Sequence, residues 1–363
     1  MTTPSAAMER TAKKQRMEAL LATSPSLTTL TINDSNNHGN IARALTSLMV
    51  DRCYEPDVLC HVGTDVLCHV GTALTSLSIR MCDDRPVEFL SSLQKCTGLT
   101  SLDIRDSQKV HIVSKDITSF PPLKSLTITN VVLDCTDESY NDHIGDFLRK
   151  LESLAALESL TSLDVSSCDD QSVFRESLSL PSLTSLNFSS CDMENIGCMT
   201  GMTRLRSLNA SSNSMYCLKG IAMSEALTSI DLSSCGYLSD IGPLAECTGL
   251  TSLDISSCSV EDIAPLAQCT ALTSLDASNN PDLEELGPLA CCTALESLNL
   301  SITKVRHVWA LMACTALTRL DLSLTRVLDL TPLKAFTSLS LDIGYTPAWD
   351  VVVAEAKAEA STI

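Results

Sequence analysis

The sequence predicts an α/β repeat fold, a solenoid of stacked units around a parallel β-sheet, and two observations lead to this prediction. First, a motif recurs every 22 or 23 residues from Leu160 onward, and its copy at Leu250 has apolar residues at Leu250, Leu253 and Ile255. Second, Leu253 and Ile255 are two residues apart and therefore lie on one side of a strand, with Asp254 on the other. One such unit has a single apolar edge and cannot fold alone, whereas stacked copies bury a continuous core.

The strand motif has apolar residues at its first, fourth and sixth positions. Its copies begin at Leu27, Leu45, Leu74, Leu99, Leu123, Leu160, Leu183, Leu205, Leu227, Leu250, Leu272, Leu295 and Leu317. A fourteenth copy, which ends in Leu341 and Ile343, lacks one residue. The regular units hold one strand and a short return segment, which we expect to be a 3₁₀-helix or an extended stretch. Before Leu160 the spacing is irregular.

Three segments differ from the repeats. Residues 1–26 are expected to form an N-terminal capping helix or a tail, and residues 347–363 a C-terminal capping helix on the repeat domain of residues 27–346. Within that domain, residues 131–158 contain an insertion whose apolar residues from Asp142 to Leu157 follow a helical spacing. This helix is expected to pack on its own repeat; docking of a partner on it is the alternative.

The charge of the chain limits the classes of partner. The formal net charge is −19 and the sequence pI is near 4.6. Nonspecific nucleic-acid binding depends on Lys and Arg side chains that neutralise phosphates, so the composition argues against it. Docking on an anionic membrane is disfavoured for the same reason. A protein partner, basic or neutral, fits better, although an acidic surface also promotes solubility.

The 17 cysteines follow the repeat rather than a disulfide framework. Six of them, such as Cys258, come just after a strand, and five, such as Cys269, lie three residues before a repeat. The number of cysteines is odd and their spacing follows the repeats. Both facts favour reduced, buried thiols in a reducing compartment. We therefore expect a cytoplasmic protein without a secretory leader. A nuclear location is an alternative, as is mitochondrial targeting by the basic N-terminal segment.

The stretch L-T-S-L-D-I-S-S-C at Leu250, followed by I-A-P-L-A, resembles the leucine-rich repeat, and the 22-residue length is similar to the Sds22-type and internalin-type subfamilies. The resemblance implies a curved, right-handed solenoid with its parallel sheet on the concave face, which binds other proteins. It also implies a ladder position just after each strand. That position holds Asn213 and Asn280 here, and elsewhere mainly Cys or, in the last repeats, Thr.

An acidic ladder is the first candidate binding site. Asp231, Asp254 and Asp276 occupy the fifth position of consecutive strands, on the concave surface. Neighbouring carboxylates about 5 Å apart repel by about 0.8 kcal/mol even in water, and a basic partner would relieve that repulsion. The alternative is that these residues are simply the family consensus, solvated and hydrogen-bonded to the serines beside them.

Departures from the consensus give the second candidate site. Arg52, Arg80 and Arg105 replace serines in early strands and would form a patch with nearby methionines at the N-terminal end of the concave face. Arg and Met are enriched at interfaces. In a later repeat, Trp309 stands where other copies have Pro, or Gly before it, and filling of the core is the expected reason.

These features favour a non-enzymatic scaffold that binds a protein partner on the concave face. Alternatives are a regulatory subunit of an enzyme, such as a phosphatase regulator or a ubiquitin-ligase substrate receptor, and a surface or secreted recognition protein. Neither a phosphate-binding Gly-rich loop nor a nucleophile elbow occurs in the sequence. The pairs Cys60-His61 and Cys68-His69 arise from a tandem duplication, so no metal, cofactor or small-molecule substrate is expected.

Overall fold

The computed structural model describes residues 29–33, 46–51, 73–80, 96–110, 123–133, 158–167, 180–197, 201–221 and 226–349. The chain divides into two compact units, Met1–Leu183 and Thr184–Ile363. The predicted N-terminal cap (residues 1–26), Arg52 and the predicted helix from Asp142 to Leu157 lie outside the described residues.

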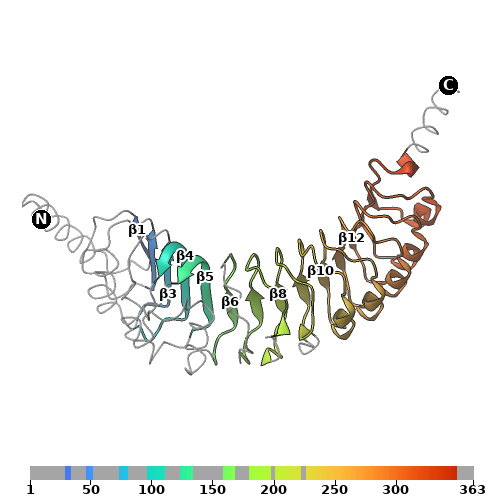
Figure 1. Ribbon diagram of the computed structural model, residues 1–363. Helices are drawn as coiled ribbons and strands as arrows, with labels where there is room; N and C mark the ends of the chain where they lie inside the picture. Colours follow the sequence, from blue (N-terminus) through green and yellow to red (C-terminus); the bar gives the residue numbers. More distant parts are fainter. Residues whose placement is uncertain are drawn as a thin grey trace, which may run out of the picture. The chain divides into compact units, whose positions relative to one another are not determined.

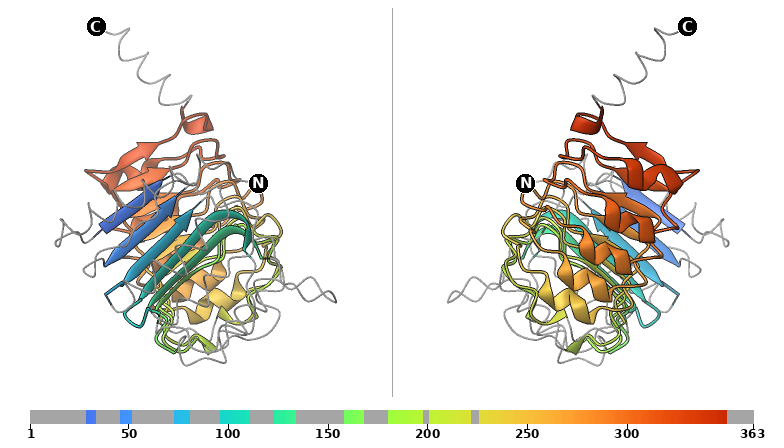
Figure 2. Two further views of the ribbon diagram at one scale, coloured as in Figure 1. Left: turned by 90° about the vertical axis from the view of Figure 1, so that its left-hand side faces the viewer. Right: turned by 90° about the vertical axis from the view of Figure 1, so that its right-hand side faces the viewer.

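Each unit is built on parallel strands that pair in sequence order. The first contains β1 (Thr29–Asn33), β2 (Ser47–Asp51), β3 (Ser76–Arg80), β4 (Ser101–Val110), β5 (Ser125–Leu133) and β6 (Ser162–Asp164). The second contains β7 (Ser185–Asn187), β8 (Ser207–Asn209), β9 (Ser229–Asp231), β10 (Ser252–Asp254), β11 (Ser274–Asp276), β12 (Ser297–Asn299), β13 (Arg319–Asp321) and β14 (Ser340–Asp342). Figure 2 shows β1 to β5 as parallel neighbours, coloured blue to teal. The predicted leucine-rich-repeat solenoid is confirmed.

Short 3₁₀-helices return the chain from one strand to the next in the second unit. They are η8 (Gly242–Glu246), η9 (Ala264–Gln268), η10 (Gly287–Cys291), η11 (Trp309–Ala313) and η12 (Thr331–Ala335). All except η11 have a proline in the first turn, where its fixed φ suits the helix and its missing N–H costs nothing. They lie on the side opposite the strands (Figure 1). The expected 3₁₀ return segment is therefore confirmed for these repeats.

The core consists of the first, fourth and sixth residues of the described strand motifs, as the periodicity predicts, except in the last motif, where Leu341 is exposed. Leu250, Leu253 and Ile255 are all buried. The return segments add one leucine each, such as Leu266 in η9. Phe188, at a sixth position, is the largest fully buried side chain of the described core.

The ladder position after each strand satisfies the backbone of the turn. The Oδ1 of Asn213 accepts hydrogen bonds from the N–H groups of Cys191 (3.0 Å) and Met193 (2.9 Å) in the preceding repeat. Its amide donates to the carbonyls of Phe188 (3.1 Å) and Ala210 (2.8 Å). Where threonine takes this position, its hydroxyl donates to the carbonyl three residues earlier, at 2.6–2.7 Å for Thr303, Thr325 and Thr346.

Cysteine can replace asparagine here because its sulfur reaches similar partners. The thiol of Cys235 donates to the carbonyl of Ala210 at 3.4 Å, and that of Cys258 donates to the carbonyl of Leu232 at 3.3 Å. Burial raises the pKa of Cys235, while hydrogen bonds from the backbone of Asn213 and Met215 oppose that rise. These two groups are the counterparts of those that Asn213 holds in its own preceding repeat.

A second column of cysteines lies behind the 3₁₀-helices. The thiols of Cys269, Cys292 and Cys314 each donate to the carbonyl of the buried leucine in the preceding helix, at 3.3–3.5 Å. All ten described cysteines are free, and only Cys217 and Cys291 of these are not buried.

The buried thiols are expected to resist alkylation. Burial raises the pKa of Cys314 to about 11 and that of Cys292 to about 12, above the ordinary value of 9.0, and the thiolate is the reactive form. Iodoacetamide labelling near neutral pH, read by peptide mass spectrometry, should modify Cys291 in the folded protein and Cys292 only after denaturation. The protonated thiols contribute stability below pH 9 that is lost as the pH rises through these raised pKa values. Equal labelling of both residues in the folded protein would contradict the packing.

Two boundaries differ from, or refine, the predicted organisation. The predicted insertion begins at residue 131, and β5 continues to Leu133, so the first three residues of the insertion extend this strand. At the other end, residues 347–349 are helical, as expected from Pro347 at a helix start. Ala348 is buried and Trp349 is about half exposed. Residues 350–363 lie outside the described part, so the C-terminal cap stays a prediction.

Candidate functional site

From β6 to β14, the side chain at the fifth position of the strand motif forms the turn that ends the strand. Its Oδ1 accepts a hydrogen bond of 2.8–3.0 Å from the N–H two residues later, which closes an Asx-turn. Aspartate makes this bond at Asp164, Asp231, Asp254, Asp276, Asp321 and Asp342, and asparagine makes it at Asn187, Asn209 and Asn299. The turn therefore requires the carbonyl-type oxygen and not the negative charge.

The acidic ladder lies on neighbouring strands in direct register. Asp254 on β10 is the partner of Asp231 on β9 and of Asp276 on β11. Burial raises the pKa of Asp254, hydrogen bonds from Ser256 oppose that rise, and the charges of Asp276 and Asp231 add to it. Three half-buried carboxylates thus repel one another on one face of the sheet. Asn299, on the next strand, donates to the Oδ2 of Asp276 at 3.0 Å and ends the run of charges.

The acidic ladder lies in a part of the chain whose sequence contains no Lys, Arg or His residue. Between Lys219 and Lys304 the sequence has 12 Asp and Glu residues and not one Lys, Arg or His. This separation of acidic from basic residues is visible in the sequence. Comparison of single positions with the L-D-I-S-S motif does not reveal it, because it is a property of several repeats together. No ion pair within these repeats can therefore neutralise Asp254.

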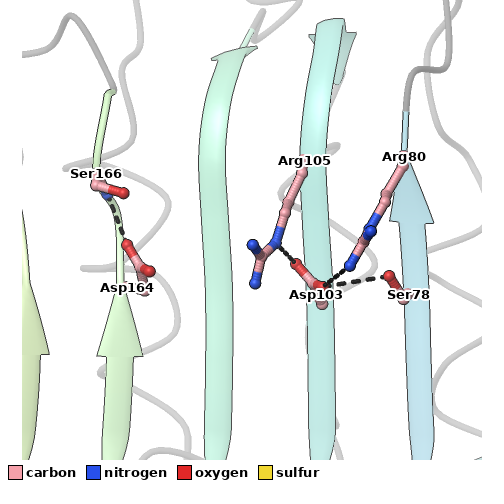
Figure 3. Close-up of polar contacts among 6 residues, drawn as sticks. All are labelled: Ser78, Arg80, Asp103, Arg105, Asp164 and Ser166. Carbon is pink, nitrogen blue, oxygen red and sulfur yellow. Dashed lines mark hydrogen bonds and ion pairs between the residues drawn. The ribbon is translucent and has the colours of Figure 1, made fainter.

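The arginines at the N-terminal end converge on one carboxylate. Arg80 on β3 and Arg105 on β4 are partners in the sheet, and both reach Asp103 (Figure 3). The Nε of Arg105 donates to Oδ1 of Asp103 at 2.6 Å, and Arg80 lies 3.6 Å from Oδ2, which also accepts a bond of 3.2 Å from Ser78. The bond to Asp103 raises the pKa of Arg105.

The two arginines of this cluster are open to solvent, whereas Asp103 is more buried. The two arginine side chains are 41% and 42% exposed, against 18% for Asp103. Sequence reasoning placed the arginines in one patch but did not connect them with Asp103, because the side-chain conformations that bring them together are a property of the folded sheet. Figure 3 also shows Asp164, two strands away, held in its own turn by Ser166.

Trp309 does not fill the core. It begins η11 and is 53% exposed, so the expectation of core filling was wrong. The corresponding residues of η8, η9 and η10 are Gly242, Ala264 and Gly287, which are also exposed. Leu311, two residues later, occupies the buried site instead.

Among the described residues, no cluster of His, Cys, Asp or Glu side chains has an arrangement that could hold a metal ion. No helix in that same part of the chain has the length and apolarity to cross a membrane.

Comparison with known proteins supports the architecture. A family model described as Leucine Rich repeat matches residues 179–200, and no curated protein matches the sequence. An internalin (InlF) from Listeria monocytogenes superposes with a TM-score of 0.65 at 19% identity, over 92% of this chain and 94% of the internalin. A leucine-rich-repeat protein from Leptospira interrogans gives a TM-score of 0.53 at 16% identity, over 84% and 85%. A chain in a complex of TLR13 with ssRNA13 gives 0.56 at 19% identity, over 89% of this chain and 50% of the other. At these identities the likeness establishes the fold.

Proposed function

Because the chain is a leucine-rich-repeat protein, we propose that it is a non-enzymatic binding module that holds a basic segment of a protein partner on the sheet face of its second unit. The contact residues are Asp231, Asp254 and Asp276. The observation that carries the proposal is the register of these three carboxylates within repeats that contain no cation.

The charge on this ladder is not needed for folding. Asn209 makes the same Asx-turn on β8 as Asp231 makes on β9, each with a bond of about 3 Å to the N–H two residues later. Asparagine would thus close the turn without repulsion. With aspartate at these positions, burial raises the pKa of Asp254 and the charges of Asp276 and Asp231 raise it further. A bound Lys or Arg side chain would remove that repulsion, which supports recognition as the reason for the charge.

The test uses variants that keep the turn and remove the charge. In the triple variant Asp231→Asn, Asp254→Asn, Asp276→Asn, the affinity for decalysine at low ionic strength should fall by about tenfold, since each exposed charge pair contributes roughly 0.5 kcal/mol. Isothermal titration calorimetry measures this. The circular dichroism spectrum should be unchanged, and Tm should stay the same or rise because the repulsion is gone.

A matched control separates the ladder from net charge. Glu261, Glu284 and Glu285 are exposed acids in the return segments of the same repeats, so their change to Gln alters the net charge equally. That control should bind decalysine like wild type. Equal loss in both triple variants would mean that decalysine responds only to overall charge, and the ladder would not be the site.

The cluster of Arg80, Arg105 and Asp103 is a second contact in this proposal, since arginine is enriched at interfaces and both arginine side chains are largely open to solvent. A cytoplasmic location, expected from the periodic placement of the cysteines in the sequence, is also part of this proposal.

A further inference from the structure

The last three repeats carry exposed apolar side chains at a position where the fold demands a left-handed backbone. Ile302, Leu324 and Tyr345 have φ of 58°, 57° and 60°, and they are 44%, 52% and 85% exposed. They occupy the eighth position of their repeats, directly before the ladder residues Thr303, Thr325 and Thr346. The three residues are called the apolar column below.

Polar residues serve this backbone position in the repeats before the column. Ser212, Ser234, Ser257 and Asn279 have φ between 53° and 59° at the same place. Left-handed geometry disfavours every residue with a Cβ, and a β-branched residue such as Ile302 most of all. The apolar column therefore combines backbone strain with exposure of apolar surface to water, and neither benefits the isolated fold. Strain combined with exposed apolar surface is typical of a binding site.

Backbone hydrogen bonds between successive repeats align the three residues of the apolar column. The N–H of Ile302 donates to the carbonyl of Ser323 at 3.0 Å, and the N–H of Leu324 donates to the carbonyl of Gly344 at 2.8 Å. Strands β12, β13 and β14 pair in register, so successive column residues are one strand spacing apart, about 4.8 Å. Side chains three and four apart on an α-helix lie about 5–6 Å from each other, close to this spacing. Same-face side chains of an extended strand are about 6.6 Å apart and match it less well.

The sequence around the apolar column is mainly basic, whereas the repeats that contain the acidic ladder have only acidic charged residues. From Lys304 to Lys334 the chain has five Lys and Arg residues and only two acids. Two of the cations, Lys304 and Arg326, follow the column residues Ile302 and Leu324 by two positions. Lys304 pairs with Asp282 of the preceding repeat, while Arg306 and Arg326 are exposed. An apolar line beside cations suits a partner with apolar and acidic groups.

We propose that the apolar column is the docking site for an amphipathic helix of a partner protein, a helix whose apolar stripe is flanked by acidic residues. Its apolar side chains cover Ile302, Leu324 and Tyr345, and its carboxylates meet Arg326 and the neighbouring cations. This site is separate from the acidic ladder and does not depend on the function proposed for it.

The test replaces the column with the residue that earlier repeats use. The variant Ile302→Ser, Leu324→Ser, Tyr345→Ser keeps a residue type proven at this backbone position, so folding should be retained, with Tm as the check. The probe is a labelled synthetic helix with leucines at i, i+3, i+4 and i+7 and glutamates beside them. Fluorescence anisotropy should show binding to wild type and at least a tenfold loss in the variant, since burial of apolar area drives the contact.

Two controls make the result specific. Tyr216→Ser with Tyr237→Ser removes other exposed aromatic side chains and should leave binding of the glutamate helix unchanged. A helix with lysines in place of glutamates should bind the column poorly, and any binding to the acidic ladder should be equal in wild type and in the column variant. If the triple serine variant does not fold, Tyr345→Ser alone, at the most exposed position, gives the same comparison.

Several outcomes would overturn the proposal. Equal binding of the glutamate helix to wild type and to the column variant would exclude the column as the site, as would no binding to either. Equal, column-dependent binding of the lysine and glutamate helices would refute the acidic partner. Concentration-dependent dimerisation of wild type, lost in the column variant by analytical ultracentrifugation, would assign the column to a second copy. Column-dependent binding to phosphatidylcholine vesicles would assign it to a lipid surface.

Discussion

Replacement of Asn213 by alanine is expected to lower the free energy of unfolding by about 3 kcal/mol. The variant loses an acceptor for the buried N–H groups of Cys191 and Met193 and a donor to the carbonyls of Phe188 and Ala210. Each buried backbone group left without its partner costs about 1–3 kcal/mol, and no water can easily replace a side chain that is 5% exposed. Urea denaturation followed by circular dichroism measures the change.

The chain supplies a matched control for this prediction. Asn213→Cys introduces the residue that two later repeats use at the same position, Cys235 and Cys258. Because the sulfur of Cys235 reaches two backbone groups of the preceding repeat, cysteine should recover about half of the lost stability, as weaker hydrogen bonds allow. Alanine and cysteine variants of equal stability would show that the Asn213 side chain acts through volume rather than through hydrogen bonds.

Phe188→Ala is expected to destabilise the second unit by about 4 kcal/mol, the usual cost of removing a fully buried phenyl ring. Phe188 has no exposed surface and follows the end of β7, and the same motif position of the next repeat holds the small residue Ala210. The large cavity cannot be filled by the small residue beside it. Thermal and urea unfolding would both report the loss.

Phe188→Leu is the appropriate comparison, since Leu232 fills the same position two repeats later. It should cost less than about 2 kcal/mol, because leucine replaces most of the apolar volume. A similar loss for alanine and leucine would indicate that the aromatic shape, rather than the filled volume, stabilises this part of the core.

The fold could be predicted from the sequence because the repeats share one pattern of apolar positions. The burial of Leu253 and Ile255 follows from a period of two along the strand, and the proline of I-A-P-L-A marks the start of the 3₁₀-helix η9. Stacking of identical units leaves few alternatives once that period is recognised. The C-terminal ends of β4 and β5 could not be predicted, since both strands continue beyond the residues that the repeat motif covers.

The candidate sites were less predictable, for reasons that differ from one site to another. The strand motif places Asp103, Arg80 and Arg105 on one face, but it does not give the side-chain conformations in which both arginines reach the Asp103 carboxylate. Trp309 looked like a core residue because tryptophan is large and apolar, but the start of each 3₁₀-helix faces solvent. Ile302 has an exposed side chain in a strained backbone, and this combination is visible only when its φ is known.

The direction of the backbone hydrogen bonds at the strand ends has a consequence for how such a chain can change in length. The N–H of Ser234 bonds to Ser256, and that of Ser257 bonds to Ser278, so each repeat completes the turn of the one before it. Loss or gain of a whole repeat by recombination leaves every remaining bond with an equivalent partner. A deletion of only a few residues would shift the turn residues away from their partners in the next copy. A change by one whole repeat therefore preserves the turns, and a repeat with aspartate at its fifth position lengthens or shortens the row of carboxylates by one.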